Sequence, residues 1–367
     1  MAVDRSFWRG KRVLITGHTG FKGGWLALWL SQLGADVVGY ALAPVGDAHL
    51  FGALRLQELL RHEEGDIRDQ AHLLAVMQSH RPEVVFHLAA QALVRPSYND
   101  PVETYDVNVM GSLKVLECVR RCPSVRAVVM VTTDKCYENK EWCWAYREID
   151  PMGGHDPYSA SKGAMELMVA SYRRSYFSVG AANTAGQPVP AVATVRAGNV
   201  IGGGDWSEDR LVPDLVRAFS ANAPAIVRNR HAVRPWQHVL QPLRGYLQLA
   251  QQLVLSGHDH AEAWNFGPQE DDCQPVGALV QQMTSLWGDG RTWVDQTDPD
   301  APHEAHFLKL DSAKARGRLG WRSNCDLPQA LRLSVDWYRA HSLGEDMRAI
   351  SLDQIAQQAH KDGDAVP

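Results

Sequence analysis

Two side chains with the spacing of a catalytic pair occur near the middle of the chain, in the segment YSASK. Tyr158 and Lys162 are four residues apart, so a helix would present both on one face. A phenol has a pKa near ~10 and can act as a base at neutral pH only if positive charge lies close to it. Lys162 could supply that charge. We therefore expect Tyr158 to exchange a proton with a substrate.

A second group of reactive side chains follows an apolar run, in the segment VTTDK that contains Thr132, Thr133, Asp134 and Lys135. An adjacent carboxyl and amine can serve as acid and base if the pKa of Asp134 is raised and that of Lys135 is lowered. Alternatively, the two residues form a charged pair with a structural role at the end of a strand. The sequence leaves both possibilities open.

A glycine-rich turn near the start of the chain predicts a nucleotide cofactor. Gly17, Gly20 and Gly23 lie between the apolar run RVLITG and a helical pattern. Glycines let the backbone turn tightly and approach a pyrophosphate, whose charge lies at the helix N-terminus. His18 and Lys22, within the turn, could add positive charge to that contact or could simply be solvated.

Further candidates for the cofactor site lie where later apolar runs end. Asp66 stands where a side chain that contacts adenine is expected, and the small residues Ala89 and Ala90 would let a cofactor cross the edge of a sheet. The second run ends at Tyr40 without the acidic residue that usually holds the adenosine ribose of NAD, so this position leaves the cofactor's identity open. The expected cofactor contacts are Gly17, His18, Gly20, Phe21, Lys22, Gly23, Asp66, Ile67, Leu88, Ala89, Ala90, Thr132, Tyr158 and Lys162.

A parallel sheet is the element that would bring these residues together. Short apolar runs alternate with amphipathic stretches through the first half of the chain, a pattern typical of βαβ repeats. We therefore expect an α/β fold with a Rossmann-type, doubly wound parallel sheet. The expected runs are 12–17, 36–40, 83–90, 127–134 and 191–200.

The domain organisation follows from a change of pattern after residue 200. We expect a nucleotide-binding domain over residues 1–200, onto which residues 239–267 pack back. Residues 201–350, rich at first in Gly, Pro, Trp and Arg, would form mainly a smaller α/β substrate lobe. The tail, residues 351–367, would be a short helix with a frayed end.

Composition argues against several other classes of protein. With 37 Lys and Arg against 42 Asp and Glu, the 367-residue chain lacks the basic field of a nucleic-acid binder. It shows no leader segment and no apolar run of membrane-spanning length, which predicts a cytoplasmic protein. The six cysteines form no CxxC pair and are expected to be reduced. His303 and His306 are three residues apart rather than four, so we expect no metal site.

The motifs TGHTGFKG, HLAAQ, VTTD, YSASK and AGNV together resemble the extended short-chain dehydrogenase/reductase family. Asp134 and Lys135 occupy the acid and base positions of the sugar-nucleotide 4,6-dehydratases in that family; most of these have Asp-Glu, and the branch that acts on CDP-glucose has Asp-Lys. Epimerases generally have small residues there. The resemblance to this branch covers nearly the whole chain, through FWRGKRVLITGHTGFKGGWLALWL, DKCYENKEW, AGNVIGGGDW, RPWQHV, WNFGP and HEAHFLKLD.

The resemblance implies a hydro-lyase reaction that needs no second substrate to regenerate its NAD. Tyr158, assisted by Thr133, would take the proton of the sugar 4-OH while NAD accepts hydride from C4. Lys135 would remove the C5 proton, directly or through Asp134 or a water, and Asp134 would protonate the departing 6-OH. Return of the hydride to C6 would give CDP-4-keto-6-deoxy-glucose, an intermediate of deoxysugar biosynthesis such as that of lipopolysaccharide O-antigen.

A nucleoside diphosphate carries two negative charges, which arginine can hold through bidentate contacts. By resemblance, Asn199, Arg228 and Arg234 are the best substrate contacts, with His238 and the segment around His303 at the nucleotide end. Other arginines could contact substrate, lie on the surface or brace the lobes; these are Arg95, Arg196 and Arg210.

Apolar residues on more than one face of the helices near 103–121 and 157–177 predict a homodimer through a four-helix bundle, as is usual in this family. Two other functions fit part of the pattern. A sugar-nucleotide 4-epimerase would need Tyr158 and Lys162 but not the acid and base at 134 and 135. A non-catalytic NAD-sensing regulator could keep the glycine turn but would have no reason to keep Thr133, Tyr158 and Lys162 together.

Overall fold

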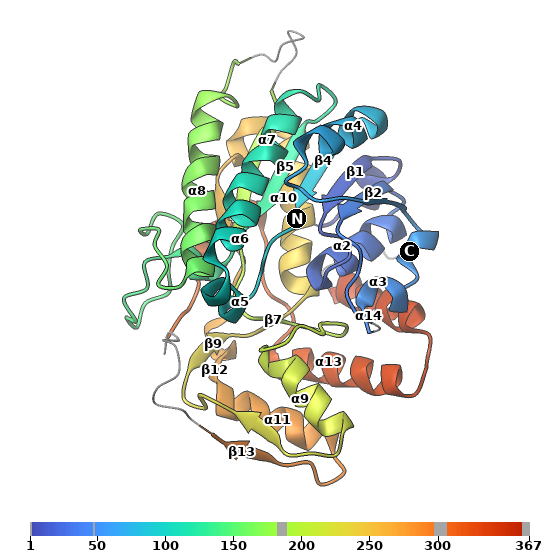
Figure 1. Ribbon diagram of the computed structural model, residues 1–367, viewed down its shortest axis with the longest axis vertical. Coiled ribbons are helices and arrows are strands. Elements are labelled where there is room, and N and C mark those ends of the chain that lie inside the picture. Colours follow the sequence, from blue (N-terminus) through green and yellow to red (C-terminus); the bar gives the residue numbers. More distant parts are fainter. Residues whose placement is uncertain (1, 47, 182–188, 297–306, 362–367) are drawn as a thin grey trace.

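A seven-stranded sheet forms the centre of the computed structural model, which describes residues 2–46, 48–181, 189–296 and 307–361. All neighbouring strands are parallel, in the order β11-β6-β5-β4-β1-β2-β3. Figure 1 labels β1, β2, β4 and β5 of this sheet. The expected Rossmann-type α/β fold is confirmed. The strands are β1 (Arg12–Thr16), β2 (Asp36–Ala41), β3 (Arg61–Glu64), β4 (Val84–His87), β5 (Ala127–Val131), β6 (Ala191–Arg196) and β11 (Ala263–Asn265).

The central strands are continuous apolar runs because helices cover both faces of the sheet. Successive side chains of a strand point to opposite faces, and β1 follows this rule. Val13 and Ile15 pack in the core shared with α2 and α10, whereas Leu14 packs in the core shared with α4, α7 and α8. These helices are α2 (Phe21–Gln32), α4 (Gln70–His80), α7 (Ser112–Arg120), α8 (Pro157–Ser175) and α10 (Leu240–Leu255).

Residues 239–267 return to the sheet. They contain α10, which packs against β5 and β6, and β11, which pairs with β6 in the register Ala263↔Thr194. The sheet therefore combines strands from before and after the start of the second lobe.

The second lobe lies below the sheet in Figure 1, around α9, α11 and α13. Three two-stranded sheets complete it and join it to the first domain: β7 with β10, β8 with β13, and β9 with β12. Their bounds, with those of the larger helices, are β7 (Val200–Ile201), β8 (Ala225–Val227), β9 (Val233–Pro235), β10 (Gln237–His238), β12 (Cys273–Pro275), β13 (Trp293–Asp295), α9 (Leu211–Ser220), α11 (Val276–Trp287) and α13 (Leu327–Ser342). The short helices are α1 (Arg5–Trp8), α3 (Leu50–Ala53), α5 (Val94–Asn99), α6 (Pro101–Tyr105) and α12 (Ala313–Leu319).

Helix α8 starts at a defined point, which fixes where Tyr158 lies. Asp156 caps the helix by accepting hydrogen bonds from the Ser159 backbone N–H at 2.9 Å and from the Ser159 hydroxyl at 2.6 Å. Pro157 follows at the first helical position, where its missing N–H costs no hydrogen bond. Tyr158 is therefore held in the first turn and Lys162 one turn later.

The C-terminal helix begins earlier than predicted. Helix α14 runs from Met347 to Lys361, beginning before residue 351, and packs against α13 and α2. Ser351 is fully buried and accepts a hydrogen bond from Trp337 Nε1 at 2.9 Å. Among the described residues, no helix is both long and apolar enough to cross a membrane.

Candidate active site

Two adjoining cavities lie at the carboxyl edge of the sheet. One, of about 350 Å³, runs along the ends of β1 to β5 and is called here the cofactor cavity. The other, of about 300 Å³, lies between the sheet and the second lobe and is called the substrate cavity. The residues that line both are Phe21, Lys22, Ala92, Thr132, Tyr158 and Arg210. A molecule in one cavity can therefore reach a molecule in the other beside Tyr158.

The glycine turn forms one wall of the cofactor cavity. At Gly17 and Gly23 the backbone packs so closely that no larger residue fits. Gly17 has φ +80°, and a Cβ on it would lie 2.6 Å from the backbone nitrogen of Ala89. A Cβ on Gly23 would lie 2.1 Å from the carbonyl oxygen of Gly17. Helix α2 begins directly after Gly20 without a side-chain cap, which leaves first-turn N–H groups for an anion. The turn thus fits a pyrophosphate.

Replacement of Gly17 with alanine is expected to destabilise the fold more than the same change at Gly46. Both glycines have a positive φ, +80° and +77°, which costs an L-residue about 1–2 kcal/mol. Only Gly17 has neighbours within 4 Å of a new Cβ, and such overpacking costs about 1–3 kcal/mol more. Denaturant unfolding of the two variants measures the difference. Equal losses of free energy of unfolding would contradict this account of the turn.

His18 lies away from the cofactor cavity, which corrects the predicted phosphate contact. Its ring is fully buried, and its Nε2 lies 2.7 Å from Nδ1 of His62. Burial, and secondly the charge on His62, lowers the pKa of His18 to about 3, so this ring is neutral. The ring also fills the space beside Gly39, where a Cβ would lie 2.2 Å from it. His18 therefore packs the turn against β2.

The far end of the cofactor cavity carries an ion-pair cluster that sequence reasoning missed in part. Asp66 lines the cavity, as predicted, and its carboxylate accepts a hydrogen bond from Arg68 Nη2 at 2.6 Å. Arg68 also pairs with Glu103 at 2.5 Å and with Asp106 at 3.4 Å. Arg68 was not predicted, although its position two residues after Asp66 in GDIRD could have indicated an ion pair with that residue. The other predicted contacts in this cavity are Gly17, Gly20, Phe21, Lys22, Gly23, Ile67, Leu88, Ala89, Ala90, Thr132, Tyr158 and Lys162.

Tyr158 lies at the junction of the cavities, and Lys162 lines the cofactor cavity one helical turn further along α8. Burial raises the pKa of Tyr158 to about 12, although a hydrogen bond with the Thr133 side chain and the charge of Arg210 act in the opposite direction. Lys162 donates a hydrogen bond from Nζ to the carbonyl oxygen of Val131 at 3.2 Å. Burial, and secondly the charge of Lys22, lowers the pKa of Lys162 to about 8.

Asp134 has the environment of an acid rather than that of a partner in an ion pair. It is buried, and burial raises the pKa of its carboxyl against the opposing effects of Lys135, Thr133, Lys22 and Arg234. Its Oδ1 accepts a hydrogen bond from the Thr133 hydroxyl at 3.0 Å, while its buried Oδ2 has no hydrogen-bond partner among the described residues. The free oxygen and raised pKa favour the acid-base hypothesis over a structural ion pair.

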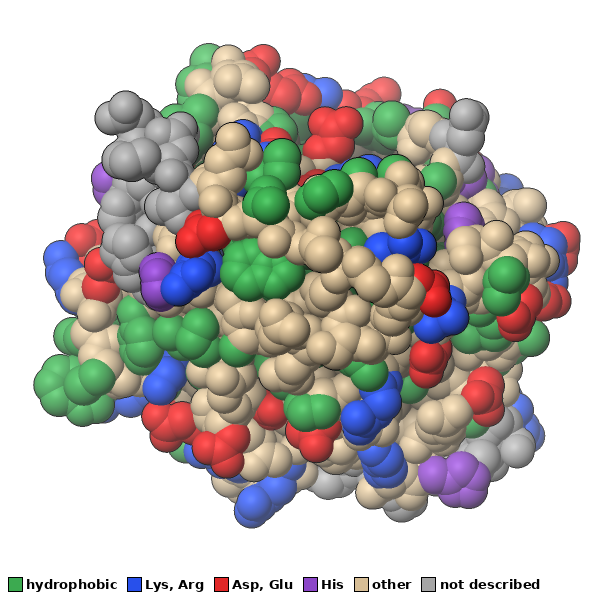
Figure 2. Space-filling model, turned by 90° about the horizontal axis from the view of Figure 1, so that it is seen from below, with side chains coloured by type: hydrophobic (Ala, Val, Ile, Leu, Met, Phe, Trp, Pro, Cys, Tyr) green, Lys and Arg blue, Asp and Glu red, His purple; other side chains and the backbone are tan. Residues whose placement is uncertain are grey.

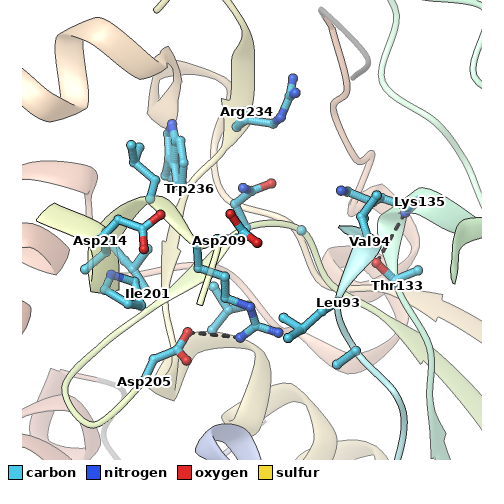
Figure 3. A pocket seen from close by; sticks show the side chains of 18 of the residues that line it. Leu93, Val94, Thr133, Lys135, Ile201, Asp205, Asp209, Asp214, Arg234 and Trp236 are labelled. Atoms are coloured by element: carbon cyan, nitrogen blue, oxygen red, sulfur yellow. Dashed lines mark hydrogen bonds and ion pairs between the residues drawn. The ribbon is translucent and has the colours of Figure 1, made fainter. Parts of the chain in front are cut away.

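The substrate cavity brings together residues from both parts of the chain (Figure 3). Thr133 and Lys135 approach it from one side, and Asp209 and Trp236 from the other. Its predicted polar contacts include Arg95, Asn199, Arg210, Arg228 and Arg234.

Acidic side chains already hold three of these arginines. Arg228 Nη1 donates to Asp209 Oδ1 at 2.8 Å, and Arg95 Nη1 lies 3.5 Å from the same oxygen. Arg210 Nη1 donates to Asp205 Oδ2 at 2.9 Å. Asp205 and Asp209 were not predicted, although both lie in the segment GGGDWSEDR before α9. They hold the arginine side chains at the edge of the cavity.

Two predicted substrate contacts lie outside this cavity. Arg196 is buried under the sheet edge, where Glu166 binds it through two hydrogen bonds of 2.8 Å. His238 is fully buried beside Trp25, with a ring-centroid distance of 6.2 Å, and burial lowers its pKa to about 3. A further predicted contact, His303, lies outside the described residues, as does His306. The described residues hold no group of three or more His, Cys, Asp or Glu side chains suited to a metal ion.

The model of a family described as GDP-mannose 4,6 dehydratase matches residues 14–333. The chain belongs to this family. The CDP-glucose 4,6-dehydratase of Salmonella typhimurium is 49% identical to this chain over 354 residues, which are 96% of this chain and 98% of that protein. The resemblance to the extended short-chain dehydrogenase/reductases is thus confirmed.

Solved structures share the fold. The dTDP-glucose 4,6-dehydratase of Bacillus anthracis, in complex with NAD, has a TM-score of 0.74 at 20% identity, covering 92% of this chain and 100% of that one. The UDP-glucose-4-epimerase of Stenotrophomonas maltophila, with bound NAD and a nucleotide sugar, has a TM-score of 0.78 at 23% identity, covering 91% and 99%. Because dehydratases and epimerases share this fold, the assignment of a reaction depends on the site.

Proposed function

We propose that this chain is an NAD-dependent CDP-glucose 4,6-dehydratase, which forms CDP-4-keto-6-deoxy-glucose and water. The observation that carries the proposal is Asp134, a buried carboxyl with a raised pKa and an unbonded oxygen, next to Lys135 in the cavity that Tyr158 enters. An epimerase has no use for that acid-base pair. The choice of CDP-glucose is supported by the 49% identical relative.

The cofactor cavity fits NAD. The glycine turn would hold the pyrophosphate, Ile67 and Ala89 would flank the adenosine half, and Lys162 would lie near the nicotinamide half. NAD supplies a hydride acceptor for C4 of the sugar and the hydride donor for C6. Carboxylates of Asp66 and Glu103 already bind Arg68, so this arginine is not free to contact the 2′-phosphate that distinguishes NADP from NAD.

The first proton transfer would be made by Tyr158. Its hydroxyl lies at the junction of the cavities and is hydrogen-bonded to the Thr133 side chain, which would hold the sugar 4-OH in place. A pKa of about 12 is too high for a base at neutral pH, so nearby positive charge must lower it in the working complex. Arg210 already acts on the pKa of Tyr158 in this direction, and Lys162, which lines the cofactor cavity with Tyr158, would add to it.

The elimination would be carried out by Asp134 and Lys135. A ketone at C4 makes the C5 proton acidic, and Lys135 would remove this proton directly, through Asp134 or through a water. Asp134, kept protonated by burial, would donate its proton to the departing 6-OH. Arg95, Arg228 and Arg234 would hold the diphosphate while the sugar reacts.

Cofactor binding is expected to weaken as the pH rises through about 8. Burial lowers the pKa of both Lys22 and Lys162 to about 8, so each carries its charge below that pH and loses it above. A charge-assisted hydrogen bond contributes about 1.5–3 kcal/mol, so the charge lost from each lysine between about pH 7 and about pH 9 should raise the Kd for NAD roughly five- to tenfold. Fluorescence titration at about pH 7 and about pH 9 measures this. A Kd that is constant or falls would contradict it.

Isotope tracing tests the proposed reaction. CDP-glucose carrying deuterium at C4 should give a product with deuterium at C6, because the hydride taken from C4 is returned to C6. Deuterium retained at C4 in a stereoisomer of the substrate would instead identify an epimerase. No turnover of any nucleotide sugar would favour the non-catalytic regulator.

The homodimer remains part of this proposal. Helices α6 and α7 follow each other end to end through the π-helix Asp106–Gly111, and α8 stands beside them at one edge of the molecule in Figure 1. Large apolar side chains lie exposed there, among them Val102 at 77% and Leu167 at 63%. Replacement of Leu167 with aspartate should shift the mass found by light scattering from dimer to monomer. A monomeric wild-type protein would overturn the proposal.

We also propose a cytoplasmic location and a role in deoxysugar biosynthesis, including that of O-antigen, because NAD and nucleotide sugars are cytoplasmic metabolites. Nucleic acid is not among the proposed partners. On the face seen in Figure 2, basic and acidic side chains are interspersed and form no continuous basic surface.

A further inference from the structure

Glu166 is buried and accepts four hydrogen bonds, all from side chains outside its own helix. Arg196 donates to it twice, from Nε to Oε1 and from Nη2 to Oε2, both at 2.8 Å. The hydroxyls of Thr132 and Thr194 donate to the same two oxygens, at 2.5 Å and 2.7 Å. Burial opposes ionisation, but Arg196 and the two hydroxyls together hold the pKa of Glu166 below its usual value. The carboxylate is therefore charged and fixed.

This ion pair connects the elements that carry the proposed catalytic residues. Glu166 lies on α8, one turn after Lys162 and two turns after Tyr158. Thr132, which it binds, follows β5 and directly precedes Thr133. The position of the helix that holds Tyr158 is thus tied to the strand end from which Thr133 reaches Tyr158.

Arg196 extends the connection to the other side of the turn that carries Asp134 and Lys135. Its Nη1 donates to the hydroxyl of Tyr137 at 2.6 Å, and that hydroxyl donates to Oδ1 of Asn265 at 2.7 Å. Tyr137 follows the short 3₁₀ helix Asp134–Cys136 immediately. The turn is therefore held before its start through Thr132 and after its end through Tyr137, by the two halves of one ion pair.

We propose that Glu166 and Arg196 are positioning residues that set the distances between Tyr158, Thr133 and the turn bearing Asp134 and Lys135. The inference rests on the proposed dehydratase function. A buried ion pair stabilises a fold no better than well-packed apolar residues, so stability alone does not account for this pair. Neither side chain lines the cofactor or the substrate cavity, so their effect on the reaction is indirect.

Two variants test the proposal. Glu166→Gln combined with Arg196→Met removes both charges together, and Tyr137→Phe removes only the hydroxyl that links Arg196 to Asn265. We expect kcat for CDP-glucose to fall about tenfold or more in each, because proton transfer is sensitive to small displacements. The KM for CDP-glucose and the Kd for NAD should change less than about threefold, because the cavity walls remain in place.

Ser351→Ala is the matched control for Tyr137→Phe, since it also removes one fully buried hydroxyl, here the acceptor of Trp337 Nε1. It should lower the melting temperature and leave kcat unchanged. Folded variants with wild-type kcat, or with KM and Kd raised in parallel with the loss of kcat, would overturn the inference while the dehydratase function stands. A wild-type protein that does not dehydrate CDP-glucose would overturn the proposed function, and the inference with it.

Discussion

Replacement of Tyr158 with phenylalanine is expected to lower kcat for the dehydration of CDP-glucose by about 10²- to 10⁴-fold, the usual contribution of a general acid-base residue. The change removes one oxygen from the point where the two cavities meet and where the Thr133 side chain is hydrogen-bonded. The aromatic ring remains to fill its space. The proton of the sugar 4-OH then has no acceptor, so the first step should fail.

The measurement is steady-state turnover, with the Kd for NAD as a check that the cavity is intact. Tyr172→Phe is the matched control, because Tyr172 lies on the same helix, and its hydroxyl bonds to Glu117 at 3.0 Å away from both cavities. It should keep wild-type kcat. Turnover by Tyr158→Phe at the wild-type rate would show that another group accepts the proton.

Replacement of Asp134 with asparagine is expected to slow the loss of water by a similar factor, about 10²-fold or more, but to leave the earlier steps in place. Asparagine has nearly the same shape as aspartic acid but cannot protonate the leaving 6-OH. If Lys135 removes the C5 proton, substrate recovered from the variant in heavy water should carry deuterium at C5. Lys135→Met should show neither dehydration nor this exchange.

Asp272→Asn provides the comparison for Asp134→Asn. Asp272 is another buried carboxyl whose pKa is raised by burial, but it accepts a hydrogen bond from the Leu327 N–H and lies outside both cavities. It should keep wild-type dehydration. Unimpaired dehydration by Asp134→Asn would refute its role as the acid. Dehydration lost together with C5 exchange would show that Asp134 removes the proton itself.

The fold and the centre of the site could be predicted because both depend on local patterns. Apolar runs predicted five of the seven strands, but not β3, whose sequence RHEE is polar, or the short β11. Parallel strands place their carboxyl ends at one edge. That edge brings Gly17, Thr133 and Tyr158 together although they are far apart in the chain. The spacing of Tyr158 and Lys162 on one helix was sufficient to pair them.

The misplaced residues depend on contacts that no local pattern contains. Arg196 was predicted to bind the diphosphate because it is an arginine. Its partner in the structure is Glu166, which lies 30 residues earlier on another element. His18 stands in the phosphate turn, yet its partner His62 lies 44 residues away on β3. In both cases burial beside a distant partner decides the role of the polar side chain. A single sequence does not specify which polar residues are buried in this way.

The arginines of the substrate cavity show an intermediate case. Their type predicted a diphosphate site, and the structure lines the cavity with Arg95, Arg228 and Arg234. The carboxylate of Asp209, which contacts two of them, comes from a residue with φ +58° and was not predictable from spacing.

The central claim is tested most directly by incubating the purified protein with NAD and, in separate reactions, CDP-glucose, dTDP-glucose, UDP-glucose and GDP-mannose. Mass spectrometry then follows each nucleotide sugar. We predict the loss of one water from CDP-glucose and no change in the other three. An unchanged mass in all four reactions, with a new stereoisomer on chromatography, would contradict the account and identify an epimerase.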